Sequence, residues 1–142
     1  MTASNTRILY VGSDPEFCDS IRAVFNERSA EFVCTFAITG KQALELAEAQ
    51  KFDLLISEYG LYDMTGDRLC RKIRERDGST PLLIYASVYR DSDHEAATNS
   101  GANAYILKSD GTSNLVSAIR RLTRRPEPTT SRYHATRSLS IL

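Results

Sequence analysis

The sequence predicts a three-layer α/β sandwich, in which helices cover both faces of one parallel sheet. Short apolar runs without polar alternation, at residues 7–12, 54–57 and 82–87, are typical of strands buried on both faces. Segments with helical apolar spacing separate these runs. Strands that alternate with helices imply right-handed crossovers and therefore a parallel sheet. With 142 residues and 42% hydrophobic content, the chain suits one globular domain.

Five strands and five helices are expected in strict alternation. Each helical segment carries apolar residues on one face, as Leu115, Ile119 and Leu122 do in the last one. The expected strands cover residues 7–12, 31–36, 54–57, 82–87 and 103–107. The expected helices begin at residue 15 and then cover residues 39–50, 65–76, 91–100 and 112–124.

Local signals mark several helix ends. Asp14 followed by Pro15 predicts a helix start, because Asp caps helix N-termini and Pro fits the first helical position. Thr39 and Gln42 have the spacing of a capping box. Gly101 follows a helical segment directly, which predicts a helix end there.

Composition narrows the classes of function. No apolar stretch approaches the roughly 20 residues of a membrane span and no secretory leader is present, so we expect a cytoplasmic protein without membrane contact. The cysteines Cys18, Cys34 and Cys70 are odd in number and far apart, which favours free thiols over disulfides or zinc ligands. His94 and His134 have no neighbouring ligand residues, so we expect both in solvent and no metal site.

Charge is unevenly distributed, although the net charge is zero. Residues 1–111 carry 12 Lys and Arg against 17 Asp and Glu, a balance of −5. Residues 112–142 carry six Arg against Glu127 alone, a balance of +5. Because cations are favourable at a helix C-terminus, we expect the arginines that close the last helix to be solvated.

The composition changes after Arg125 to Pro, Thr, Ser and Arg. We therefore expect a domain at residues 6–125 and a flexible C-terminal extension at residues 126–142. A helix-turn-helix pattern is absent after Arg125, and basic residues alone support only non-specific contact with nucleic acid. No specific nucleic-acid partner is expected.

The segment around which the chain is organised covers residues 52–66, FDLLISEYGLYDMTG. Its strand ends on Glu58, and a loop rich in Gly and Asp follows. In an open parallel sheet, ligands bind in the crevice at the carboxyl ends of the strands. Glu58 is therefore expected in that crevice and not in the core.

The βα alternation, the segment DLLISEYGLYDMTG, the strand after Pro81 and GANAYILK at residues 101–108 together resemble the receiver domain of bacterial response regulators. The resemblance covers about residues 6–125 and implies a flavodoxin-like fold with strand order 2-1-3-4-5. In that family, an Asp after the third strand accepts a phosphoryl group from a histidine kinase. An acidic pair after the first strand holds Mg²⁺, and a Ser or Thr and a Lys bind the phosphoryl oxygens.

The resemblance implies that this chain matches the family at two site positions. These are the lysine, at Lys108, and the aromatic residue that changes rotamer on activation, at Tyr105. Tyr62 and Ser109 replace two prolines of the family, and the second change removes the residue that favours a cis peptide after the lysine. The chemical positions depart from the family. The acidic pair falls on Gly12 and Ser13, the acceptor on Glu58 and the hydroxyl residue on Ala86.

These departures argue against phosphorylation. Mg²⁺ binds oxygen ligands, usually one or two carboxylates, and Gly12 and Ser13 offer none. The extra methylene of Glu58 moves its carboxylate by about 1.5 Å, and a shift near that size costs on the order of 10² in rate. A register shifted by one residue would offer Asp14 as metal ligand and Ser87 as hydroxyl, although Asp14 has the pattern of a helix cap.

Two local arrangements are expected at this site. Glu58 reaches Lys108 across the crevice, the alternative being that both are solvated at its rim. Because Ala86 leaves room, Tyr105 turns inward and donates a hydrogen bond to a backbone carbonyl or water; the alternative is a half-exposed strand residue. The face made by residues 91–100, 103–107 and 112–124, with Asn99, Tyr105 and Arg120, is the expected partner or homodimer surface.

We therefore expect a pseudo-receiver that is not an enzyme, needs no cofactor and binds a signalling protein, either a histidine kinase or another regulator. An active phosphotransfer receiver with a non-standard acceptor is the alternative. A nucleotide-binding flavodoxin-like protein is a weaker alternative, because Gly12 belongs to no glycine-rich phosphate loop.

Overall fold

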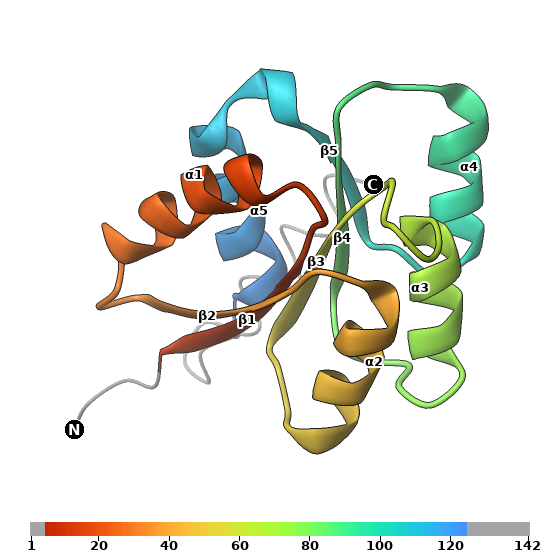
Figure 1. Ribbon diagram of the computed structural model, residues 1–142, viewed down its shortest axis with the longest axis horizontal. Helices are drawn as coiled ribbons and strands as arrows, with labels where there is room; N and C mark the ends of the chain where they lie inside the picture. Colours follow the sequence, from red (N-terminus) through yellow and green to blue (C-terminus); the bar gives the residue numbers. More distant parts are fainter. Residues whose placement is uncertain (1–4, 125–142) are drawn as a thin grey trace, which may run out of the picture.

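The computed structural model describes residues 5–124 and contains one five-stranded parallel sheet. The strand order is β2-β1-β3-β4-β5, as the resemblance implied. Figure 1 shows the strands at the centre, with helices on both sides. The strands are β1 (Thr6–Val11), β2 (Phe32–Ala37), β3 (Leu54–Glu58), β4 (Leu82–Ala86) and β5 (Ala104–Leu107).

The helices alternate with the strands, and the predicted boundaries agree within two residues. They are α1 (Pro15–Asn26), α2 (Gly40–Ala49), α3 (Gly66–Arg74), α4 (Asp91–Asn99) and α5 (Thr112–Thr123). A short 3₁₀ helix, η1 (Lys108–Asp110), was not expected. None of the helices within residues 5–124 is long and apolar enough to cross a lipid bilayer.

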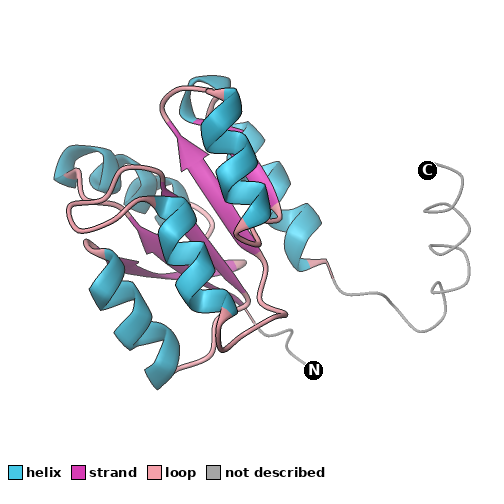
Figure 2. Ribbon diagram, turned by 90° about the vertical axis from the view of Figure 1, so that its right-hand side faces the viewer, coloured by secondary structure: helices cyan, strands magenta, loops and turns pink. Residues whose placement is uncertain are grey.

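Alternate residues of each strand enter two separate cores, one on each face of the sheet. Ile8 and Tyr10 of β1 pack with α1 and α5, whereas Leu9 and Val11 pack with α2, α3 and α4. Figure 2 looks onto the layer of α2, α3 and α4, with the strands behind it. Because Glu58 follows Leu54 and Ile56 in alternation, its side chain lies on the α1 and α5 face.

The predicted helix caps are present. Asp14 accepts a hydrogen bond from the Glu16 N–H at 3.1 Å, and Thr39 accepts one from the Gln42 N–H at 3.0 Å. The Gln42 side chain accepts from Ile38 N–H at 2.9 Å, one residue before the cap. Gly101 ends α4 with a φ of 101°, a conformation that side chains other than glycine rarely adopt.

The expected position of Arg120 on the face of α4 and β5 is wrong. Its guanidinium pairs with the Glu31 carboxylate through nitrogen–oxygen distances of 2.8 and 2.9 Å. Glu31 directly precedes β2, which lies at the opposite edge of the sheet from β5. Arg120 therefore joins α5 to the start of β2 and is not part of the predicted partner face.

The predictions for the C-terminal extension and for His134 lie outside the described residues. The same holds for Arg125, the last residue of the predicted domain. Cys18, Cys34 and Cys70 are free thiols, as expected.

Asp63 ties the loop after β3 to the start of α2. Its two carboxylate oxygens accept hydrogen bonds from the backbone N–H groups of Gly40 and Lys41, at 2.8 and 2.9 Å. Desolvation opposes the charge of Asp63, but these backbone hydrogen bonds outweigh it and lower the pKa of the carboxyl group. The carboxylate thus caps α2 from a neighbouring loop.

We predict that Asp63→Ala lowers the free energy of unfolding by about 1 kcal/mol at pH 7, the typical cost of a lost helix cap. Because the folded-state pKa is lowered, this contribution is complete above the unfolded pKa of about 4 and is lost as pH falls below it. Urea denaturation at several pH values measures the difference. Glu45→Ala, on the exposed side of α2, is the control; an equal loss in both variants contradicts a capping role.

Candidate functional site

The carboxyl ends of β3, β4 and β5 surround an open crevice of about 390 Å³. Its lining includes Asp14, Glu58, Ser87, Tyr105 and Lys108, so the sheet brings together residues that are far apart in sequence. A larger cavity, about 550 Å³, lies between α2, α3 and the start of β3 and contains none of the predicted site residues. The chemistry of the side chains, and not cavity size, marks the crevice as the candidate site.

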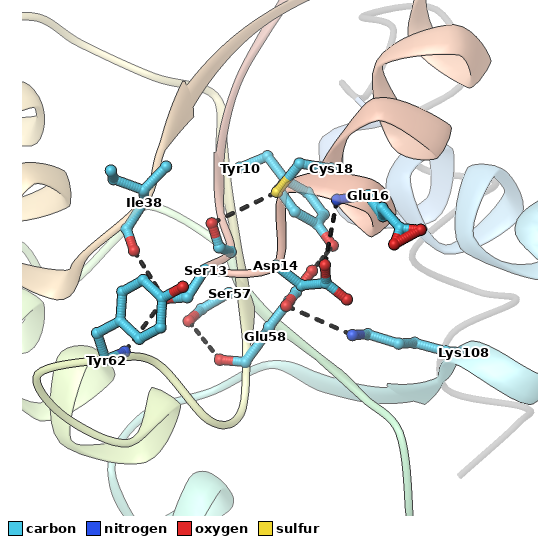
Figure 3. Close-up of polar contacts among 11 residues, drawn as sticks. Tyr10, Ser13, Asp14, Glu16, Cys18, Ile38, Ser57, Glu58, Tyr62 and Lys108 are labelled. Atoms are coloured by element: carbon cyan, nitrogen blue, oxygen red, sulfur yellow. Dashed lines mark hydrogen bonds and ion pairs between the residues drawn. The ribbon is translucent and has the colours of Figure 1, made fainter.

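Glu58 is buried at the bottom of the site and has two partners (Figure 3). The Tyr10 hydroxyl donates a hydrogen bond to Oε2 at 2.5 Å, and Lys108 Nζ lies 3.4 Å from Oε1. The side chains of Glu58 and Lys108 are only 6% and 18% exposed. The expected contact between Glu58 and Lys108 is therefore confirmed, and the alternative of a solvated pair at the rim is not what the structure shows.

Lys108 also lies over an aromatic ring. Its Nζ is 4.0 Å from the centroid of the Phe17 ring, which comes from the first turn of α1. A cation over a ring face is attracted to the π-electrons, and the attraction grows when the pair is shielded from water. Phe17 and Glu58 thus hold the ammonium group from two sides. The peptide bond that follows Lys108 is trans.

Gly12 leaves the space that the Glu58 carboxylate occupies. A Cβ atom at Gly12 would lie 2.6 Å from Glu58 Oε2 and 2.9 Å from Cε1 of the Tyr10 ring. Both distances are far below van der Waals contact, so any larger residue would have to displace one of these groups. Burial and then the negative charge of Glu58 raise the pKa of Tyr10 well above its usual value. The tyrosine therefore remains a hydrogen-bond donor.

Ser13 joins two neighbouring loops. Its hydroxyl donates to the Ile38 carbonyl at 2.7 Å and accepts a hydrogen bond from the Tyr62 N–H at 3.1 Å (Figure 3). The side chain is largely buried. Its hydrogen-bonding groups are thus directed at backbone atoms and not into the crevice.

The residues present do not fit a Mg²⁺ site of the kind that the resemblance implied. Gly12 has no side chain, Ser13 binds backbone, and the Asp14 carboxylate caps α1. No group of three or more His, Cys, Asp or Glu side chains within residues 5–124 could hold a metal ion. Mg²⁺ requires closely spaced oxygen ligands, which this edge of the sheet does not assemble.

Tyr105 is half-buried, and its hydroxyl donates to the Val88 carbonyl at 3.1 Å. The predicted hydrogen bond to a backbone carbonyl is therefore present, but the side chain is only half-buried, which matches the alternative of a half-exposed strand residue. The Tyr105 ring also contacts the rings of Tyr89 and His94, with centroids 5.8 and 5.5 Å away. His94 is exposed, as expected, and its ring joins Tyr89 and Tyr105 in an aromatic cluster that was not expected from the sequence.

Sequence reasoning missed Tyr10 and Phe17. The alternation of side chains along β1 was an available signal for Tyr10. Tyr10 and Gly12 lie two residues apart and therefore share one face of the sheet. No sequence signal places the Tyr10 hydroxyl at Glu58, because that contact depends on the direction of a buried side chain on another strand. Phe17 lies at helical spacing from Ile21 and Phe25, a pattern that indicates only a position facing the core.

Comparisons with known proteins agree with this geometry. The family model described as "Response regulator receiver domain" matches residues 8–120. The chain is 31% identical over 109 residues to an uncharacterized 14.6 kDa protein of Leptolyngbya boryana, which covers 75% of this chain and 82% of the relative. It is 30% identical over 124 residues to the response regulator MprA of Mycobacterium leprae, covering 86% of this chain and 53% of MprA.

Among solved structures, the BeF3-activated N-terminal receiver domain of Klebsiella pneumoniae RstA aligns with a TM-score of 0.78 and 27% identity. The alignment covers 84% of this chain and all of that domain. The chain spans about half the length of MprA, and the shared part corresponds to a receiver. On the family match and this agreement in fold, the chain belongs to the response regulator receiver domain family.

Proposed function

We propose that this receiver domain is a pseudo-receiver, which signals through protein contacts and accepts no phosphoryl group at Glu58. Receiver domains of two-component systems interact with histidine kinases or other proteins, so a protein partner follows from the family. The absence of phosphorylation is the part that is specific to this chain. It rests on the surroundings of Glu58.

The observation that carries the proposal is the double engagement of the Glu58 carboxylate. One oxygen accepts from the Tyr10 hydroxyl and the other lies against the Lys108 ammonium group. Both oxygens are thus already engaged, and attack on a phosphoryl donor would compete with the Tyr10 hydrogen bond or with the Lys108 ion pair. Leaving a buried polar group unsatisfied costs about 1–3 kcal/mol, and more where the group is charged.

The lack of space for a metal ion is a second obstacle to phosphorylation. The Glu58 carboxylate and the Tyr10 ring lie directly against Gly12, where the family has an acidic side chain. Phosphoryl transfer to a carboxylate brings negative charges together, and a divalent cation normally offsets them. At this site Lys108 already neutralises Glu58, and Arg90, which also lines the crevice, pairs with Asp93.

A partner surface is supported on the side of α4 and β5. Val88 and Tyr89 are 50% and 52% exposed, and Tyr89 packs against Tyr105 and His94. Exposed aromatic residues are enriched at protein interfaces. We propose that the partner or homodimer contact forms at this cluster. Asn99, which was also expected in this surface, lies at the far end of α4 from His94.

The second candidate function is an active phosphotransfer receiver that uses the shifted register. Asp14 and Ser87 both line the crevice together with Lys108, which favours it. Against it, Asp14 is the cap of α1 and is a single carboxylate. The two candidates differ in one measurable property, the uptake of a phosphoryl group.

We predict that the purified protein takes up no phosphoryl group from acetyl phosphate in the presence of Mg²⁺, because the site assembles no pair of metal carboxylates. Intact-mass spectrometry should show one unshifted species. A receiver with the family's acidic pair and acceptor Asp is the positive control. A mass increase that Glu58→Gln or Asp14→Asn abolishes would instead establish the active receiver.

We also predict that Gly12→Ala lowers the free energy of unfolding by about 1–3 kcal/mol, since the new methyl group overpacks against Glu58 and Tyr10. The same substitution in a Glu58→Ala background should cost less, because the clashing carboxylate is gone. Denaturant titrations of the four proteins form a double-mutant cycle. Gly60→Ala, where a Cβ meets nothing within 4 Å, controls for glycine replacement. Additive effects of the two substitutions would refute the direct contact.

A further inference from the structure

Exposed large apolar side chains gather at one end of the domain. Among the described residues, five large hydrophobic side chains are exposed, and four of them lie in loops at the carboxyl edge of the sheet. These four are Ile38, Tyr62, Val88 and Tyr89, with exposed fractions between 50% and 75%. They follow three different strands, so the fold and not the sequence brings them to one edge.

Hydrogen bonds with side-chain hydroxyl groups fix the backbone at three of these positions. The Ser13 hydroxyl links the backbones of Ile38 and Tyr62, which lie side by side in Figure 3. On the other side, the Tyr105 hydroxyl binds the Val88 carbonyl. A surface that is already ordered loses little conformational entropy when a ligand covers it.

The crevice beside these residues has an acidic rim. Asp14 and Asp93 line it, and Glu16 and Asp91 lie near them in sequence, in the first turns of α1 and α4. Arg90 is the basic neighbour and pairs with Asp93. The Glu58–Lys108 pair below contributes no net charge. A segment that combines basic and apolar side chains complements this edge in both respects.

The chain itself contains such a segment. Residues 125–142 lie outside the described part and carry three arginines against Glu127. Arg137 is followed closely by Leu139, Ile141 and Leu142. The rest of the chain, by contrast, has an excess of acidic residues.

Chain length permits the contact. α5 begins next to the crevice and, with 12 residues, covers about 18 Å along the sheet, so Arg124 lies near the opposite edge. The 13 residues from Arg124 to Arg137 can span up to about 43 Å when extended. This span is more than twice the distance back to the crevice.

We propose that residues 137–142 bind across the crevice of their own chain, with Leu139 and Ile141 against Val88 and Tyr89 and with Arg137 facing the acidic rim. The segment then masks both the crevice and the aromatic cluster from a partner. This inference goes beyond the proposed function. The contact itself needs no assumption about phosphorylation, and only the masking of a partner rests on the partner surface proposed above.

The test compares amide NMR spectra of the full chain with those of a variant carrying Leu139→Ser, Ile141→Ser and Leu142→Ser. The variant should shift the signals of Tyr62, Val88 and Tyr89. The matched control is a variant with Thr129→Ser, Thr130→Ser and Thr136→Ser, which should leave these three signals unchanged. The differences should persist on tenfold dilution, since the contact is within one chain.

A peptide of residues 132–142 provides the second arm. Added to the serine variant, the peptide should move the shifted signals back to their positions in the unaltered chain. It should bind the unaltered chain roughly tenfold more weakly than the variant, because the attached segment competes for the same site at high effective concentration. An Arg137→Glu peptide should bind more weakly than the native peptide at low salt.

Three results would overturn the proposal. The first is an absence of shifts at the crevice in the serine variant. The second is shifts confined to the cavity between α2 and α3, near Ala47 and Ile73, which would place the segment there. The third is loss of the differences on dilution, which would mean that the segment binds a second copy of the chain.

Discussion

A buried carboxylate at the end of the central strand is the constraint on which the site depends. Glu58 is nearly inaccessible to solvent, and a buried charge must be paired and hydrogen-bonded to be tolerated. Tyr10 supplies the hydrogen bond and Lys108 supplies the opposite charge. Removing either partner would leave a charge without compensation in a largely apolar environment, which is far more costly than losing an exposed ion pair.

The same constraint explains the neighbouring residues. The longer side chain of Glu58 needs space, and Gly12 provides it directly after the adjacent strand β1. Tyr10 stabilises the carboxylate by donating a hydrogen bond, and Phe17 supports Lys108 from α1. Tyr10, Gly12, Glu58 and Lys108 therefore form one interdependent set. We infer that a substitution toward the ordinary receiver pattern at one of these positions is opposed by the others.

The fold could be predicted from the sequence because apolar residues recur with clearly different periods in the strands and helices of this chain. Residues that cap helices, such as Asp14 and Thr39, also mark where the helices begin. It also predicted the contact between Glu58 and Lys108, since parallel strands converge at one edge. It could not predict contacts that depend on side-chain direction or on the rotation of a helix. Tyr10 and His94 illustrate the first limit, and Arg120, which faces Glu31 at the opposite edge, illustrates the second.

The most direct measurement of the central claim is a Mg²⁺ titration followed by amide NMR signals at the crevice. We infer that Glu58, Tyr10 and Gly12 leave no room for a metal ion. The amide signals of Gly12, Ser13 and Glu58 should then stay unshifted up to about 20 mM Mg²⁺, because no pair of carboxylates is available to bind the ion. A variant with Tyr10→Val, Gly12→Asp, Ser13→Asp and Glu58→Asp, which restores the family's acidic residues, should show saturable shifts. Saturable shifts in the unaltered chain at millimolar Mg²⁺ would contradict the claim.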